Sequence, residues 1–324
     1  MRSVVMVRGA ALAMLLVTPG CQEDGARCVR DQDCAGGQVC ADGVCSVVMG
    51  QDSAPVEAGA ELGADATPAL DLTLADGGDS GGVCPANQDG KIQRAEMLFT
   101  VPSQVTVTLG TGLTLDLKGA QVAGKTVWDL TAVAADDKSS LMKIEAVSGW
   151  AASSFKGATY ASELSANFGF FSKTALVGVF KVTPTALQLV GAASTKANHT
   201  RFSYTTPLDT LRFPMGEGTN YVTQSEVKGT MELAVPVWLQ EKYTVSVLKR
   251  GSLKLYPNFA LDTLLVSVKQ EVHNKANPLL KSSTQVYLFM AECYGVVARV
   301  IAKDAAVKDL SKVVVKERWK LSAP

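Results

Sequence analysis

Residues 243–269 read YTVSVLKRGSLKLYPNFALDTLLVSVK, and apolar side chains alternate with polar ones through most of this stretch. The alternation covers residues 243–248, 251–256 and 263–269. Successive side chains of a strand point to opposite faces of a sheet, so a period of two is typical of strands with one buried face. The stretch therefore predicts consecutive β-strands.

The same pattern recurs towards the N-terminus, in residues 105–109 (VTVTL) and 113–117 (LTLDL). Pro184 interrupts an apolar run, and we expect it at a strand boundary or sheet edge because proline has no amide proton for the ladder. Counting by this rule gives about a dozen strands. Residues 301–310 are the one candidate for a long helix. The predicted fold is mainly β, with an antiparallel sheet that forms a half-barrel, a closed barrel or a sandwich.

Composition allows a large folded domain with an uneven charge distribution. The chain has 324 residues, of which 47% are hydrophobic and 19% charged, so it is not disordered as a whole. The formal net charge is zero, but residues 1–83 hold four Arg, no Lys and twelve Asp or Glu, a net charge of −8. The remainder therefore carries +8.

The first twenty residues have the features of an export signal. Arg2 and Arg8 form a positive region, and the apolar run of residues 9–17 is too short for a permanent membrane helix. The following residues resemble a bacterial lipobox, which would make Cys21 the lipidated residue, although Thr18 stands where Leu is usual. Cleavage by the ordinary signal peptidase would instead leave Cys21 as a free thiol or a disulfide partner.

Four of the seven cysteines lie close together, in CVRDQDCAGGQVCADGVC at residues 28–45. The segment has almost no apolar residues, so in an oxidising compartment it needs disulfides to hold a shape. Zinc is the alternative, but its usual signature is two C-x2-C pairs, and the gaps here are five, five and four. We predict two disulfides among Cys28, Cys34, Cys40 and Cys45.

If Cys21 carries lipid and this segment forms two disulfides, Cys84 and Cys293 remain, and we predict that they pair with each other.

Residues 46–83 hold seven acidic residues and no Lys or Arg, and they have too few apolar residues to fold. The predicted layout is a signal peptide (1–20), a lipid-anchor site with a Cys-rich segment (21–45), a disordered acidic linker (46–83) and a β-rich domain (84–324).

One segment matches the P-loop pattern G-x4-G-K-[ST], with Gly119, Gly124, Lys125 and Thr126. A P-loop lies between a buried strand and a helix, whose N-terminus helps to bind phosphate. The residues before Gly119 alternate instead, and those after Thr126 begin as an aromatic strand. We interpret the match as a β-hairpin turn and expect no nucleotide and no other cofactor.

A second segment partly matches a calcium-binding EF-hand loop. Asn87, Asp89 and Glu96 occupy ligand positions three, five and twelve, but Pro85 stands where the first Asp belongs. Helices on either side are not evident. We interpret the segment as an Asx-type turn that opens the domain and predict no metal, with Ca²⁺ as the alternative.

Hydrolase signatures are missing from the sequence. His199 and His273 both lie in polar surroundings, and Ser140 with Lys143 and Ser153 with Lys156 match S-x-x-K without its companion motifs.

The C-terminus carries a positive charge, which favours binding of an anionic glycan or lipid headgroup, although a solvated face is the commoner explanation. The basic residues are Lys303, Lys308, Lys312, Lys316, Arg318 and Lys320.

Several of these features occur together in one group of proteins. The lipobox Cys21, the pattern C-x5-C-x5-C-x4-C, the acidic linker and CPANQDGKI (84–92) resemble the predicted envelope lipoproteins of myxobacteria. The strings VWDL (127–130), FPMGEG (213–218) and FMAECYG (289–295) are similar to the same group. The resemblance implies a location in the cell envelope and a domain architecture, but no catalytic residue. Resemblance to small stapled modules favours the pairs Cys28–Cys40 and Cys34–Cys45.

Two classes of function remain open at this point. The first is a non-catalytic, lipid-anchored envelope protein whose β domain binds a protein partner, a glycan or an apolar ligand. The second is an extracytoplasmic hydrolase, since a glycosidase needs only two carboxylates across a cleft. The absence of catalytic motifs favours the first. We expect an outer-membrane address, because Gln22 is not the Asp that retains enterobacterial lipoproteins at the inner membrane, and no nucleic-acid partner.

Overall fold

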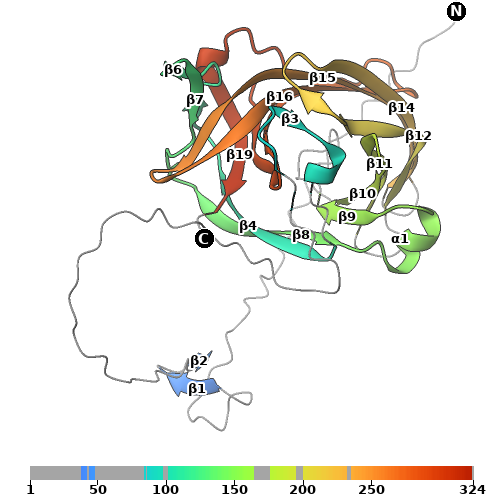
Figure 1. Cartoon of the computed structure of the whole chain (residues 1–324). Helices are drawn as coiled ribbons and strands as arrows, with labels where there is room; N and C mark the ends of the chain where they lie inside the picture. Colours follow the sequence, from blue (N-terminus) through green and yellow to red (C-terminus); the bar gives the residue numbers. More distant parts are fainter. Residues whose placement is uncertain are drawn as a thin grey trace, which may run out of the picture. The chain divides into compact units, whose positions relative to one another are not determined.

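The alternating strands close into a twelve-stranded antiparallel barrel, drawn in Figure 1. Strand β15 pairs with β14 along its first half and with β16 along most of its length, which leaves no open edge there. The antiparallel β fold predicted from the sequence is confirmed, and the closed barrel is the architecture present. In order around the barrel, the strands are β14 (Asn220–Met231), β12 (Arg201–Arg212), β11 (Ala186–Ser194), β10 (Leu176–Val182), β9 (Tyr160–Glu163), β8 (Lys138–Glu145), β4 (Ser103–Gly110), β19 (Val313–Leu321), β18 (Gly295–Ala302), β17 (Lys281–Ala291), β16 (Phe259–Asn274) and β15 (Val235–Tyr256).

The barrel belongs to the second of two units into which the chain divides, Met1–Ala75 and Asp76–Pro324. The structure, a computed structural model, describes residues 38–41, 44–47, 84, 86–97, 101–163, 176–194, 200–231 and 235–322. In the first unit, β1 (Gln38–Ala41) and β2 (Val44–Val47) form an antiparallel hairpin with Cys40 opposite Cys45. Cys21, Cys28 and Cys34 lie outside the described residues, so the lipid site and the clustered disulfides stay predictions.

The structure differs from the sequence prediction in residues 243–256, where two strands were expected. Residues 243–248 and 251–256 form a single strand, β15, with a register shift between Val247 and Lys249 in place of a turn. Gly251 follows this bulge, and a Cβ there would lie 2.5 Å from the Thr126 carbonyl oxygen. The glycine therefore allows the outer strand β7 (Lys125–Asp129) to pair in parallel with β15.

Helical structure is scarce among the described residues. They contain one six-residue α-helix, α1 (Gly149–Ser154), and two 3-10 turns, η2 (Arg94–Glu96) and η3 (Leu310–Lys312). The helix considered for residues 301–310 is wrong, because the chain leaves β18 and reaches η3 without forming an α-helix. Within the described chain, no helix has the length and hydropathy needed to cross a membrane. Pro184 lies between β10 and β11, as predicted for a strand boundary.

Apolar side chains pack on both sides of the barrel wall. The interior cluster includes Phe202, Leu208, Val245, Val266 and Met290, all almost fully buried. An outer cluster lies on the other face of β15–β19, where residues of β5 (Thr114–Leu115) and β7 cover the wall. The exposed strand β6 (Ala120–Val122) pairs with β7. Trp128 lies in this outer cluster, edge-on to Phe289 with ring centroids 5.3 Å apart.

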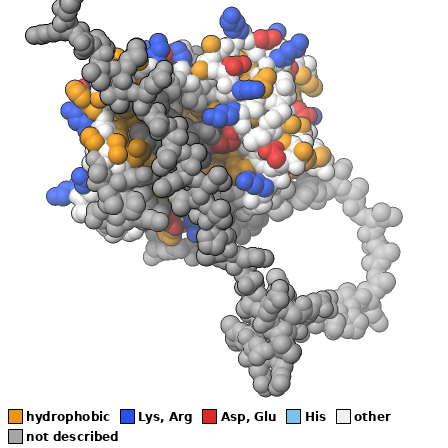
Figure 2. Space-filling model, turned by 180° about the vertical axis from the view of Figure 1, so that it is seen from behind, with side chains coloured by type: hydrophobic (Ala, Val, Ile, Leu, Met, Phe, Trp, Pro, Cys, Tyr) orange, Lys and Arg blue, Asp and Glu red, His pale blue; other side chains and the backbone are white. Residues whose placement is uncertain are grey.

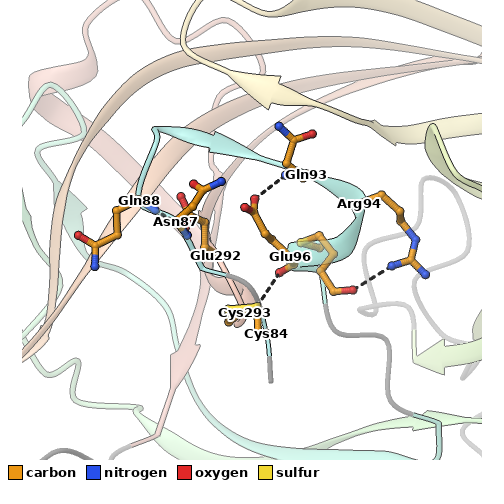
Figure 3. Close-up of a disulfide and its surroundings, with 9 residues drawn as sticks. Cys84, Asn87, Gln88, Gln93, Arg94, Glu96, Glu292 and Cys293 are labelled. Carbon is orange, nitrogen blue, oxygen red and sulfur yellow. Dashed lines mark hydrogen bonds between the residues drawn. A yellow bond between two sulfur atoms is a disulfide. The ribbon is translucent and has the colours of Figure 1, made fainter. Parts of the chain in front are cut away.

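The first described segment of the domain lies within the ring of strands (Figure 1). Its strand β3 (Lys91–Ile92) pairs with β13 (Met215–Gly216), and Ile92 and Met97 belong to the interior cluster. The predicted disulfide Cys84–Cys293 is confirmed, with the two Cα atoms 5.6 Å apart (Figure 3). It ties this segment to the turn between β17 and β18.

Two C-terminal basic residues contradict the solvated face suggested by the sequence. Arg318 is 0% exposed and Lys320 is 2% exposed, and both point to the outer face of the barrel wall. Arg318 donates to both carboxylate oxygens of Asp137 at 2.8 Å and to the Ala132 carbonyl, and Lys320 donates to the carbonyls of Leu130 and Leu255. These cations hold the outer segment against the barrel.

Candidate functional site

The segment that matches the P-loop pattern is a β-hairpin, as the sequence analysis predicted. β6 and β7 pair antiparallel, with Val122 opposite Lys125, and the two-residue turn between them uses positive φ angles at Ala123 (48°) and Gly124 (78°). Positive φ at both central residues is typical of a type I′ turn. A strand therefore follows Gly124 where a P-loop has a helix whose N-terminus binds phosphate.

The calcium-like segment uses its oxygens for local backbone contacts, of which the one between Gln93 and Glu96 is drawn in Figure 3. Asn87 Oδ1 accepts from the Asp89 amide, Asp89 Oδ1 accepts from the Lys91 amide, and buried Glu96 accepts from the Gln93 amide at 2.7 Å. These contacts form Asx turns and a capping box. Among the described residues, no three His, Cys, Asp or Glu side chains are placed to share a metal ion.

Among the described residues, Ser140 and Lys143 do not form a catalytic pair. Ser140 and Lys143 lie three residues apart on β8, so their side chains point to opposite faces of the sheet. Ser153 lies in α1, and Lys156 follows it. His273 is exposed at the end of β16, and His199 lies outside the described residues.

The barrel interior contains a buried carboxyl group that the sequence analysis did not single out. Glu241 lies on β15 between Leu239 and Tyr243, in the alternation that faces the interior, and is 1% exposed. Its Oε2 accepts hydrogen bonds from the Tyr204 hydroxyl at 2.9 Å and the Tyr243 hydroxyl at 3.3 Å. Gln270, on the neighbouring strand β16, donates to the Tyr243 hydroxyl at 3.0 Å. Three strands therefore contribute to one buried polar cluster.

Burial controls the protonation of this cluster. Desolvation raises the pKa of Glu241 to about 7, although the hydrogen bonds from Tyr204, Tyr243 and Gln270 oppose the rise. Burial also raises the pKa of both tyrosines well above the usual value, and the Glu241 charge adds to the effect. The cluster therefore changes charge near neutral pH through Glu241 alone, while its phenols stay protonated donors.

A second polar group lies on the inner face of β18 and β19. Arg299 is opposite Leu288 of the interior side and opposite Trp319, so these side chains share one face of the sheet. The Arg299 guanidinium donates to Glu317 at 2.5 Å. Arg299 Nε and Trp319 Nε1 are buried, and neither has a hydrogen-bond acceptor in the structure that is described. These two N–H donors lie beside Glu317 on an inner wall whose other buried side chains are mostly apolar.

The sequence indicates the buried position of Glu241 more clearly than that of Trp319. Glu241 belongs to the same alternation as Leu239, Tyr243, Val245 and Val247. Extending the period-two pattern back to residue 239 would therefore have predicted a carboxylate on the buried face of the strand. The alternation of β19 is broken where Ala302 pairs with Val315 and Ile301 with Glu317. That irregularity hides which of residues 317–320 face the interior.

Comparison with known proteins finds no matching protein family, no matching curated protein and no matching solved structure. The resemblance to myxobacterial envelope lipoproteins therefore stays a prediction. What the barrel can do is inferred below from its own residues.

Proposed function

We propose that the chain is a non-catalytic, lipid-anchored envelope protein whose barrel binds an apolar ligand with a hydrogen-bond-accepting head. The observation that carries the proposal is the pair of buried donors, Arg299 Nε and Trp319 Nε1, on a mostly apolar inner wall. Ligand sites are mostly apolar, with a few polar groups that fix orientation. The barrel interior has this composition.

The size of the barrel supports the same proposal. Barrels of eight strands have interiors that side chains fill or that hold one small ligand, whereas barrels of sixteen strands or more enclose a channel. Twelve strands lie between these cases. The segment with Ile92 and Met97 occupies part of the interior and is fastened there by the Cys84–Cys293 disulfide.

The two donors distinguish this wall from an ordinary core. A buried N–H group without an acceptor costs about 1 to 3 kcal/mol, so folded proteins pair nearly all of them. A carboxylate, ester or hydroxyl oxygen on a ligand would supply the kind of acceptor that each of these donors lacks. An internal water molecule would satisfy them equally well, and the experiment below separates these two explanations.

The test compares two substitutions that each remove one indole N–H. Trp319→Phe removes an inner donor, whereas Trp128→Phe removes an outer donor that is already bonded to the Leu117 carbonyl at 2.9 Å. We expect Trp319→Phe to weaken binding of a fluorescent fatty acid about fivefold, the effect of one hydrogen bond. Binding of an apolar probe without a polar head should not change. Trp128→Phe should alter neither affinity.

Two results would overturn the binding proposal. One is that the purified full-length chain carries no extractable apolar molecule and binds neither probe. The other is that Trp319→Phe and Trp128→Phe bind the fatty acid equally well, since the inner donor would then be satisfied without a ligand.

The anchor has its own test. In a suitable bacterium the parent chain should incorporate labelled palmitate and partition into detergent, and Cys21→Ser should do neither. Equal labelling of both would remove the lipid from the proposal and leave Cys21 as an ordinary cysteine.

A hydrolase is the second candidate, and Glu241 is the observation that favours it. Perturbed carboxyl groups with a pKa near 7 are typical of general acids. However, Glu241 accepts hydrogen bonds from two phenols, one of which accepts from the Gln270 amide, rather than facing a second carboxylate. A hydrolase acting through Glu241 would lose its activity in Glu241→Gln, whereas ligand binding should survive that substitution.

A further inference from the structure

Four large apolar side chains are exposed at one end of the barrel, and we call them the apolar rim. Leu279 is 89% exposed, Val235 51%, Leu280 46% and Trp238 45%. Val235 and Trp238 begin β15, and the two leucines belong to the turn between β16 and β17. The segments are neighbours, because the Lys275 amide donates to the Trp238 carbonyl at 2.9 Å.

The leucines are exposed on an ordered turn. The Asn274 side chain accepts from the amides of Ala276 and Asn277, each at 2.9 Å. The Leu280 amide donates to the Asn277 carbonyl, and the Asn274 amide donates to the Leu280 carbonyl. The backbone therefore holds both side chains in water, where isolated burial of either would have been favourable by about 1.5 to 3 kcal/mol.

Basic side chains surround the rim. Lys228 Nζ lies 5.6 Å from the centroid of the Trp238 ring, and Lys275 and Lys281 flank the leucine turn. Glu226 is the carboxylate within ion-pair distance of two of them, at 3.4 Å from Lys228 and 3.9 Å from Lys275. The three lysines outnumber it, so the surroundings of the rim are positive. Figure 2, a view from behind, shows that hydrophobic side chains lie among Lys and Arg side chains on the surface of the described residues.

We propose that the apolar rim docks on a membrane surface that contains anionic lipids. Contiguous exposed apolar side chains with a polar border mark interaction sites. Trp and Lys are amphipathic residues of the membrane interface, with an apolar body and a polar end. Leu279 and Leu280 insert among the acyl chains, and the lysines meet anionic headgroups, whose attraction is worth about fivefold in binding for each Lys near the surface.

The rim also has a defined place relative to the interior. Trp238 and Leu239 precede Glu241 on β15, whereas the β3–β13 pair lies near the other end of β14, next to Asn220. Docking at the rim therefore brings the Glu241 end of the barrel to the membrane. The proposal does not require that the barrel bind a ligand.

The experiment uses the full chain with Cys21→Ser, so that no lipid anchor contributes. Binding is measured by flotation with vesicles of phosphatidylcholine alone and of phosphatidylcholine with phosphatidylglycerol. We expect binding to the anionic vesicles to fall about tenfold or more in Leu279→Ser with Leu280→Ser, because two exposed leucines lose their apolar surface. Val133→Ser is the matched control, since Val133 is 78% exposed away from the rim, and it should bind like the parent.

The lysines are tested separately. Lys275→Gln with Lys281→Gln should lower binding to anionic vesicles about fivefold per lysine and leave binding to neutral vesicles unchanged. Three results would overturn the proposal: no vesicle binding by the parent, equal binding by the leucine variant, or a parent dimer that the leucine variant converts to monomer. Fatty-acid binding by the leucine variant should stay at the parent level, so failure here and failure of ligand binding are distinguishable.

Discussion

The two faces of β19 use polar side chains in opposite ways. On the outer face, Arg318 and Lys320 donate to Asp137 and to three backbone carbonyls. On the inner face, Trp319 has no acceptor for its indole N–H in the described structure, and neighbouring Arg299 has none for its Nε. Arg318 Nε also lacks an acceptor, but the other two nitrogens of its guanidinium donate three bonds.

The difference separates a structural role from a binding role. Buried polar groups that hold a fold together are normally satisfied by other parts of the chain, as Lys320 and two of the three guanidinium nitrogens of Arg318 are. Donors that remain unsatisfied on an apolar wall are placed to meet something else. The inner face is therefore the candidate binding surface. Four predictions about the inner and outer parts of the barrel are given in order of decreasing expected effect.

The largest expected effect concerns the segment fastened within the barrel. Cys84 and Cys293 are 209 residues apart, and closing a loop of that length stabilises by about 5 kcal/mol in the chain-entropy model. Cys84→Ser with Cys293→Ser should lower the free energy of urea unfolding by about that amount while the far-UV spectrum stays β. The parent treated with reductant is the control and should match the variant. Unchanged stability would show that the bond does not form in solution.

The second prediction breaks the outer cluster. Asp137→Ala leaves Arg318, which is 0% exposed, without its carboxylate, and breaking a buried ion pair costs about 3 to 5 kcal/mol. The matched control is Asp262→Ala, which removes an exposed Arg–Asp pair with Arg250 and should cost no more than about 1 kcal/mol. Fatty-acid binding should be unaffected by either. A ligand-binding defect in Asp137→Ala at full folding would contradict the division between the two faces.

The third prediction concerns pH and the inner face. Because burial raises the pKa of Glu241 from 4.5 to about 7, the folded chain binds more protons than the unfolded chain between these values. Stability from this group is therefore complete below pH 4.5 and is lost as the pH rises through 7, a change of about 3 kcal/mol. Glu241→Gln cannot ionise, so its stability should fall less over this range. Parallel curves for parent and variant would show that Glu241 titrates normally.

The sequence predicted the fold better than the site, and the reasons are physical. Period-two alternation is local, so residues 105–109, 243–248, 251–256 and 263–269 are recognisable as strands without any knowledge of their partners. Barrel closure depends on pairings far apart in the chain, such as β4 with β19, which no local pattern contains. The disulfide was predictable only because the other cysteines had been assigned.

The polar groups of the wall show where the local reading fails. In the sequence VVVKERWKL, Arg318 and Lys320 are expected to be exposed to solvent. They are buried because the register shift near Val315 changes which residues of β19 face outward. Whether a buried donor finds an acceptor depends on segments far away in sequence, as Asp137 is from Arg318. A single sequence therefore indicates that a strand has a buried face, but not which buried polar groups are left without partners.

The smallest expected effect tests the division most directly, by comparing two tryptophans. Trp128→Phe and Trp319→Phe remove the same atoms from buried sites, so the cost of lost volume is similar in both. Trp128→Phe also leaves the Leu117 carbonyl without its donor, whereas Trp319→Phe removes a donor that has no acceptor in the described structure. After extraction of apolar molecules, Trp128→Phe should therefore lose about 1 to 2 kcal/mol more than Trp319→Phe in urea unfolding. Equal losses would mean that Trp319 Nε1 has a hydrogen-bond acceptor within the protein in solution. The indole donors of the inner and outer faces would then be equally satisfied.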